Sequence, residues 1–270
     1  MFSPIVFEII MLGLAIGVVL GVTGAGGAIL SVPLLTVMLH LNINQAAPIG
    51  LFAIAIASMM AALMGLREGI VRYKAAVLMA GMGLLLAPLG LWLAQRLPNA
   101  PLVMVFVVVL LFVAWRMWHS GEVNDATYAQ TSAQTFACER SDVSGKFIWT
   151  LPCARALAVT GGLAGFLSGL IGVGGGFIIV PSLKRNTNLD MRAIVATSLA
   201  VIALVSISSV AIATHQGLMD WQIGLPFAAG TVVGMLAGRW LGQHLPSHVH
   251  TRGFAVLAVV AAGMMLVKLL

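Results

Sequence analysis

GVTGAGGAILSVP, residues 21–33, places four glycines within seven positions of an apolar segment and then ends on a proline. Consecutive glycines permit positive φ angles, and each lowers the stability of a continuous helix by about 1 kcal/mol relative to alanine. A second stretch with the same pattern, GLIGVGGGFIIVP, occupies residues 169–181. We therefore expect a helix to be interrupted at both places.

The composition of the chain is typical of a membrane protein. Of its 270 residues 60% are hydrophobic and 8% are charged, and the mean hydropathy is +1.06, whereas soluble domains carry roughly 25% charged residues. Uncharged runs long enough to cross a bilayer recur along the chain, and they lack the period-two alternation of barrel strands. An all-α polytopic membrane protein is therefore expected, with runs at about 46–66, 75–95, 101–115, 193–214, 222–238 and 253–267.

Sliding the sequence along itself by 148 residues aligns the two glycine clusters without a gap. Gly24 then meets Gly172, and the block GLWLAQRLP at 90–98 meets GRWLGQHLP at 238–246. An ungapped offset that extends from the glycines to matching Trp, Gln and Pro residues is specific even in apolar sequence. We predict a tandem repeat.

Basic residues occupy equivalent loops differently in the two repeats. The loop at 67–74 is basic while its counterpart at 215–220 has no Lys or Arg, and the loop at 184–192 is basic while its counterpart near 40–45 has none. Lys and Arg favour cytoplasmic loops, so equivalent loops are predicted on opposite sides, as in the inverted repeats of many transporters. This orientation also explains the formal charge of +6 without a nucleic-acid partner. The basic residues are Arg67, Arg72, Lys74, Lys184, Arg185 and Arg192.

The predicted fold is therefore two inverted-topology repeats, residues 1–118 and 151–270, joined by a polar linker at 119–150. Each repeat is expected to hold a Gly-broken hairpin of two short segments plus three transmembrane helices, about ten segments in all. The linker holds most of the acidic residues outside the spans. We expect it to be cytoplasmic and leave its flexibility open.

The glycines admit several interpretations. A phosphate-binding loop is excluded, because no Gly-Lys-Ser/Thr follows the turn and no soluble strand precedes it. Close helix packing is favoured for the small-xxx-small pairs at 17–21 and 165–169. At 24–27 and 172–176 a restarting helix would point its unpaired N–H groups and positive dipole end at the break, where a buried anion could bind. Amides satisfied by water and neighbouring helices alone remain the alternative.

Few hydroxyl side chains lie near the breaks. Thr197 and Ser198 open a span after the second basic loop and are the preferred contacts, whereas their counterparts Ile49 and Gly50 carry no hydroxyl. Any one hydroxyl can instead bond its own helix backbone. The predicted substrate-binding set is Thr23, Gly24, Ala25, Gly26, Gly27, Gly172, Val173, Gly174, Gly175, Gly176, Thr197 and Ser198.

The sequence shows no constellation for catalysis or metal binding. Its six histidines do not converge and no carboxylate lies mid-span, so neither an enzyme, a cofactor nor a cation site is predicted. Arg239 lies near the end of a span and is expected to snorkel. Cys138 and Cys153 lack metal-ligand spacing, and we expect two unpaired thiols.

These motifs resemble the sulfite exporter TauE/SafE family of bacterial membrane permeases. The resemblance is carried by GVTGAGGAILSVPLL, GLIGVGGGFIIVPSL, VATSLAVIALVSISS at 195–209 and the stretch at 215–245. It implies a multi-pass protein of the cytoplasmic membrane that transports a small sulfur-containing anion: sulfite, thiosulfate or an organosulfonate. The first repeat departs from the pattern, with APIGL at 47–51 where the second has ATSLA.

The expected mechanism is alternating access, in which the two repeats rock around a central anion site in the bilayer. The expected partners are the lipid bilayer and a small anion. Proton coupling and the oligomeric state are open. The alternatives are an anion channel, a carrier for an unrelated small solute, or a membrane scaffold, although a scaffold has no need of two matching helix breaks.

Overall fold

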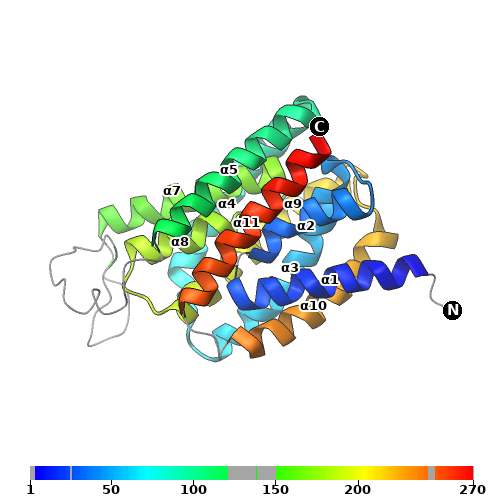
Figure 1. Cartoon of the computed structure of the whole chain (residues 1–270). Helices are drawn as coiled ribbons and strands as arrows, with labels where there is room; N and C mark the ends of the chain where they lie inside the picture. Colours follow the sequence, from blue (N-terminus) through cyan, green and yellow to red (C-terminus); the bar gives the residue numbers. More distant parts are fainter. Residues whose placement is uncertain (1–3, 25, 121–137, 139–149, 243–246, 270) are drawn as a thin grey trace.

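The computed structural model describes residues 4–24, 26–120, 138, 150–242 and 247–269, which form ten helices and no β-strand (Figure 1). They are α1 (Pro4–Thr23), α2 (Gly26–Met38), α3 (Ile43–Arg67), α4 (Tyr73–Arg96), α5 (Asn99–Ser120), α7 (Leu151–Ile171), α8 (Gly176–Asn186), α9 (Met191–His215), α10 (Trp221–Gly242) and α11 (Ser247–Leu269).

Within the described ranges, six helices are long and apolar enough to cross a membrane: α1, α3, α4, α7, α9 and α10. Large apolar side chains face outward from this bundle, and Leu85 and Trp240 are each 70% exposed. Outward apolar side chains of this kind are suited to contact with lipid chains, because lipid offers no partner for a polar group. The prediction of an all-α polytopic membrane protein is confirmed.

Both glycine clusters interrupt the helix where the sequence predicts. In the first repeat α1 gives way to α2 at Gly24, whose φ is +72°. In the second repeat four residues separate α7 from α8, and the turn contains three glycines in the left-handed region that other residues rarely adopt. Their φ angles are +78° at Gly172, +71° at Gly174 and +67° at Gly175.

The two segments of each hairpin differ in length. α1 has 20 residues and α7 has 21, whereas α2 has 13 and α8 has 11. The prediction of two short segments is therefore wrong for the first segment of each pair. The upstream glycines do not shorten α1, because Gly13 and Gly17 are helical positions that pack directly against the backbone of α10.

Glycines bring α1 and α10 into close parallel contact, and Figure 1 shows the two helices side by side. A Cβ at Gly13, Gly17 or Gly21 would collide in turn with the carbonyl oxygens of Phe227, Thr231 and Met235. The contact advances in the same direction along both helices, so they run parallel. This is the close backbone approach that small-xxx-small patterns permit in membranes.

The second repeat makes the equivalent contact with the first. A Cβ at Gly161, Gly165 or Gly169 would collide with the backbone of Met79, Gly83 and Ala87, which are the counterparts of Phe227, Thr231 and Met235 at the 148-residue offset. α7 and α4 are therefore parallel in the same way as α1 and α10. Each repeat packs its first helix against the fourth helix of the other repeat.

The corresponding helices α3 and α9 run in opposite directions against each other. Gly65, near the end of α3, lies against Ala196, near the start of α9. At the opposite ends, Pro48 and Ala213 line one cavity. Opposite directions of corresponding helices are what an inverted repeat requires. Opposite insertion of the two repeats in a membrane stays a prediction that these contacts support.

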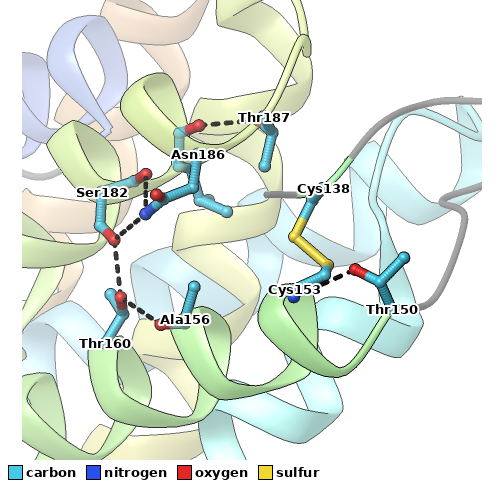
Figure 2. Close-up of a disulfide and its surroundings, with 9 residues drawn as sticks. Cys138, Thr150, Cys153, Ala156, Thr160, Ser182, Asn186 and Thr187 are labelled. Carbon is cyan, nitrogen blue, oxygen red and sulfur yellow. Dashed lines mark hydrogen bonds between the residues drawn. A yellow bond between two sulfur atoms is a disulfide. The ribbon is translucent and has the colours of Figure 1, made fainter. Parts of the chain in front are cut away.

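The linker prediction falls mostly outside the described residues, but Cys138 within it is described and forms a disulfide with Cys153 of α7 (Figure 2). The expectation of two unpaired thiols is wrong. The amide of Cys138 donates to the carbonyl oxygen of Asn186 at 3.0 Å, and Cys138 forms an isolated β-bridge with Thr187. This pairing with the end of α8 brings the two cysteine Cα atoms to 4.8 Å, a proximity that their sequence spacing does not reveal.

Candidate functional site

Two cavities of about 380 Å³ each open between the repeats. The charged pocket is lined in part by Gly21, Glu68, Asp190, Arg192, Leu199 and Arg239. The neutral pocket is lined in part by Asn44, Leu51, Gln95, Gly169, Gly172 and Gln216. Both volumes fall within the range of small-molecule sites.

The two pockets are equivalent under the internal repeat. Adding 148 to residues of the neutral pocket gives residues of the charged pocket: Leu51 becomes Leu199, and Asn44 becomes Arg192. The reverse holds for the glycine at the end of the first helix, since Gly21 of the charged pocket corresponds to Gly169 of the neutral one. The structure therefore has one of these pockets at each repeat interface, at opposite ends of antiparallel helices.

A barrier separates the two pockets. We define the barrier as the part of α3 between Leu51 and Ala61 and the part of α9 between Leu199 and Ser209, because the first residue of each pair lines one pocket and the second lines the other. Ten residues of helix rise about 15 Å. The barrier is thus about half as thick as the roughly 30 Å hydrocarbon core of a bilayer.

Gly174 of the second break lies at the centre of the barrier. A Cβ built on it would lie 3.2 Å from the Cγ2 of Ile202 and 3.8 Å from the Cγ2 of Ile54. These two isoleucines are equivalent at the 148-residue offset, so Gly174 lies close to the axis that relates the repeats. The same Cβ would be 3.4 Å from the hydroxyl oxygen of Ser206.

Ser206 has a buried hydroxyl with no hydrogen-bond partner among the described residues, and so does Ser168 on the last turn of α7. Both side chains are fully buried. Ser58, the first-repeat counterpart of Ser206, instead donates to the carbonyl oxygen of Ile54 on its own helix. An unpaired buried hydroxyl is uncommon and costs roughly 1–3 kcal/mol, so Ser206 is available to a ligand in a way that Ser58 is not.

The amides of the breaks divide into two groups. Those of Gly24 and Gly172 donate back to Leu20 and Ser168, each at 2.8 Å, and so complete the preceding helix. α8 starts after them with Gly175 as N-cap in the left-handed region, and residues 173–177 are all buried. The first amides of a helix have no partner within it, so the start of α8 presents buried donors beside Ser206.

The structure separates the predicted site residues. Gly174 lies against the barrier, Gly175 packs against Ala164 of α7, and Gly172 lines the neutral pocket. Val173 and Gly176 are buried in the same turn. Gly24 packs against Val195 at the start of α9, beside the charged pocket. Gly26 and Gly27 begin α2, where a Cβ on Gly27 would meet the carbonyl of Ile16. Ala25 lies outside the described residues.

The predicted hydroxyl contacts already have structural bonds. Thr197 accepts a hydrogen bond from the backbone N–H of Arg72 at 3.1 Å, and Ser198 donates to the carbonyl oxygen of Val195 at 2.8 Å. Thr23 donates to the carbonyl of Val19 at 2.8 Å. Their role in substrate binding stays a prediction.

Each pocket is spanned by a side-chain contact between the repeats. In the charged pocket Arg239 pairs with Glu68 at 2.6 Å and donates to the carbonyl oxygen of Ala61 at 3.1 Å. Beside the neutral pocket the amides of Gln95 and Gln216 are hydrogen-bonded at 2.5 Å. Gln216 is the counterpart of Glu68 under the repeat. The expectation that Arg239 snorkels stays a prediction, and the structure adds that Glu68 and the carbonyl oxygen of Ala61 hold its guanidinium.

Sequence reasoning missed the importance of Ser206 and the Glu68–Arg239 pair. Ser206 was visible as a hydroxyl in the middle of a span with a serine counterpart at the repeat offset, but nothing in the sequence shows which of the two would lack a partner. The ion pair joins residues 171 apart, and no local pattern connects them. The described residues contain no cluster suited to a metal ion.

Comparison with known proteins supports a transporter. Residues 9–265 match the family model described as "Sulfite exporter TauE/SafE". A "Probable membrane transporter protein" of Xylella fastidiosa (strain 9a5c) is 28% identical over 252 residues, which cover 92% of this chain and 89% of that protein. The "Probable membrane transporter protein YdhB" of Bacillus subtilis (strain 168) is 24% identical over 265 residues, covering 96% and 98%. No solved structure matches the chain.

The matched region includes both glycine breaks, both pockets and the barrier between them. Together with six candidate spans and bacterial relatives, it identifies a multi-pass protein of the cytoplasmic membrane. The chain belongs to the TauE/SafE sulfite exporter family of membrane transporters.

Proposed function

We propose that this protein is a secondary transporter that moves a small sulfur-containing anion, such as sulfite, thiosulfate or an organosulfonate, by alternating access. The observation that carries the proposal is the pair of equivalent pockets on either side of one closed barrier. A carrier needs two routes to one site, only one of which opens at a time. Membership of the sulfite exporter family supports the substrate class.

The barrier suits an oxyanion because its polar groups are donors. The buried start of α8 offers backbone N–H groups and the positive end of a helix dipole. Ser206 adds a hydroxyl that has no other partner in the described structure. The apolar side chains of Ile54 and Ile202 close the space around Gly174. Sulfite and sulfonate oxygens accept such hydrogen bonds without a buried cation.

The two inter-repeat contacts are suited to act as gates. Glu68 with Arg239 and Gln95 with Gln216 join equivalent helices at opposite ends of the molecule. In the proposed cycle, loosening of one contact widens its pocket toward the barrier while the other contact keeps the far pocket closed. Their individual strengths are small, since an exposed ion pair contributes about 0–1 kcal/mol, which permits reversible opening.

Transport by purified protein in liposomes tests the proposal. We expect uptake of labelled sulfite, thiosulfate or methanesulfonate above that of protein-free liposomes, and faster exchange when the same anion is preloaded on the other side. Preloading accelerates a carrier but not a channel. If none of these anions moves through folded protein, the substrate class is wrong.

A glycine pair provides the matched variants for this assay. Gly174→Ala and Gly217→Ala each place a methyl group on a residue with positive φ, +71° and +70°, a conformation that costs roughly 1–2 kcal/mol for an ordinary residue. Only the Gly174 methyl would enter the barrier, because nothing lies within 4 Å of a Cβ at Gly217. Gly174→Ala is expected to slow transport about 10-fold or more while Gly217→Ala retains it. Equal transport activities of the two variants would show that the anion does not pass through the barrier.

A further inference from the structure

We propose that the barrier site accepts singly charged sulfur oxyanions, hydrogensulfite or a small alkanesulfonate, and rejects doubly charged ones such as thiosulfate and sulfate. This inference rests on the proposed function and narrows its substrate class. It follows from three features of the barrier: its uncharged lining, the start of α8 that approaches it, and the hydroxyl of Ser206, which has no partner among the described residues.

The first feature is that every buried polar side chain in the described structure is a serine or threonine, among them Ser58, Thr197 and Ser206. In the described barrier segments no lysine, arginine or histidine accompanies them. The charged residues on the helices around the barrier lie at the helix ends and in the adjoining loop: Arg67 and Glu68 for α3, Lys184 and Arg185 for α8, and Asp190, Arg192 and His215 for α9. An anion in the barrier therefore has no side-chain counter-ion.

The second feature is the electrostatic contribution of the start of α8. α8 begins directly after Gly174 and Gly175, and Gly174 lies against Ile54, Ile202 and Ser206 of the barrier. A helix N-terminus is equivalent to roughly half a positive elementary charge. This partial charge offsets part of the charge of a monoanion and leaves the second charge of a dianion uncompensated.

The third feature is the hydroxyl of Ser206, which lies toward Gly174 and the start of α8 without a partner in the described residues. It can donate a hydrogen bond to an anion oxygen, and its oxygen can also accept a hydrogen bond from hydrogensulfite. Ser58 offers less, because its hydroxyl proton is already donated to Ile54. The site therefore has one side-chain hydroxyl from α9 and backbone donors from α8, enough for one sulfonate-like group.

Arg239, which contacts the end of the barrier at Ala61, is already engaged. Arg239 is paired with Glu68 and with the carbonyl of Ala61, in the charged pocket. Since uncompensated buried charge is costly, and each factor of ten corresponds to about 1.4 kcal/mol, we expect dianions to be transported at least about 100-fold more slowly than monoanions of similar size.

The test uses wild-type protein in liposomes and compares initial uptake of methanesulfonate, thiosulfate and sulfite at a fixed total concentration of each anion. The pH is raised through the range in which hydrogensulfite loses its proton. Methanesulfonate remains a monoanion, so its protein-dependent uptake should stay level. Sulfite loses its proton within this range, so its uptake should fall in proportion to the hydrogensulfite fraction, about 10-fold per pH unit at the alkaline end. Thiosulfate should enter at no more than about 1% of the methanesulfonate rate. Protein-free liposomes correct for passive entry.

The outcomes separate the two proposals. If none of the three anions moves, the proposed function is overturned and this inference falls with it. If thiosulfate moves as fast as methanesulfonate, or if sulfite uptake ignores its protonation, the proposed function stands and the monoanion inference alone is overturned.

Two serine variants on α9 then test whether the transported anion contacts Ser206. Ser206→Ala should lower methanesulfonate uptake about 10-fold by raising the half-saturating concentration, whereas Ser208→Ala, whose hydroxyl donates to Val205 at 2.7 Å, should remain within about 2-fold of wild type. Equal uptake by the two variants would place the anion elsewhere. The comparison of anions uses the unmodified chain and does not depend on either variant.

Discussion

Ser206 stands out at the scale of single residues because, among the buried hydroxyls of the described spans, it shares the lack of a hydrogen-bond partner only with Ser168. Ser198, Ser208 and Thr231 each donate to a carbonyl oxygen of their own helix, the ordinary arrangement for hydroxyl residues inside helices. Ser206 has no such bond in the described structure, although it is fully buried. A buried hydroxyl that contributes to folding stability would be expected to have a hydrogen-bond partner.

The Ser206→Ala variant should therefore unfold at the same temperature as the wild type or slightly higher, because it removes a buried group whose lack of a partner costs roughly 1–3 kcal/mol. Thermal unfolding of the purified protein in detergent measures this. A fall in the unfolding temperature would mean that the hydroxyl has a structural partner, and it would contradict the assignment of Ser206 to a ligand.

The Glu68–Arg239 pair should act on access to the charged pocket more than on stability. Since the side chain of Glu68 is 52% exposed, Glu68→Gln should change the free energy of unfolding by less than about 1 kcal/mol. Destabilising the closed state of the charged pocket by the same amount, about 1 kcal/mol, raises the population of its open state by up to about 5-fold. The measurement is the rate at which a maleimide labels a Val195→Cys reporter, which lines this pocket.

Glu8→Gln is the control for that experiment, because Glu8 is an exposed carboxylate on α1 that does not line the charged pocket. It should leave the labelling rate unchanged. An unchanged rate in Glu68→Gln as well would show that the ion pair does not restrain the pocket.

At the scale of helices, glycines determine which elements pair. Gly90 and Gly81 lie on the same helix, α4, but in different surroundings: a Cβ at Gly90 would collide with the carbonyl of Phe166, whereas nothing lies within 4 Å of a Cβ at Gly81. Gly90→Ala should lower the free energy of unfolding by about 1–3 kcal/mol through overpacking. Gly81→Ala should raise it by roughly 0.5–1 kcal/mol through helix propensity.

Chemical denaturation of both variants in the same detergent checks this prediction. Equal effects of the two substitutions would mean that α4 and α7 are not in backbone contact, and the packing arrangement of the two repeats would then be incorrect.

The disulfide between Cys138 and Cys153 should stabilise the junction of the linker with α7 and α8. It joins residues separated by 15 positions, and closing a loop of that size contributes about 3 kcal/mol in the chain-entropy model. A reducing agent should lower the unfolding temperature of the wild type and leave that of a Cys138→Ser/Cys153→Ser variant unchanged. Equal responses to the reductant would show that the two thiols are not paired.

The helices and their interruptions could be predicted from sequence because the signals are local. Runs of apolar residues indicate spans, and glycine clusters indicate breaks. The length of α1 was not predicted, because Gly13 and Gly17 lie within the helix and pack against the backbone of α10, which is more than 200 residues away in the chain.

At the scale of the whole molecule, the internal repeat organises both the packing and the pockets. The offset seen in the glycines also relates α1 with α10 to α7 with α4, and the charged pocket to the neutral one. The two pockets differ in their side chains. Arg192 and Glu68 line the charged pocket, whereas their counterparts under the repeat, Asn44 and Gln216, line the neutral pocket. The two pockets therefore have equivalent linings that differ in charge.

The sequence alone indicated the second glycine cluster as a candidate for binding but did not single out Ser206 beside it. Thr197 and Ser198 were preferred because they follow a basic loop, yet position along a span does not reveal which hydroxyls are satisfied. That depends on how α9 rotates against α3 and α8, which brings Ser206 toward Gly174. Long-range packing of this kind has no local sequence signal.

The side of the membrane from which each pocket is reached tests the central claim most directly. Ile70 lines the charged pocket and Leu218, its counterpart, lines the neutral one. Single Ile70→Cys and Leu218→Cys variants would be treated with a maleimide that cannot cross the cytoplasmic membrane. The reagent is applied both to intact cells whose outer envelope it can pass and to inside-out vesicles. Two repeats inserted in opposite directions predict labelling of Leu218→Cys from outside and of Ile70→Cys from inside, whereas labelling of both variants from the same side would contradict the inverted repeat and the two-pocket pathway built on it.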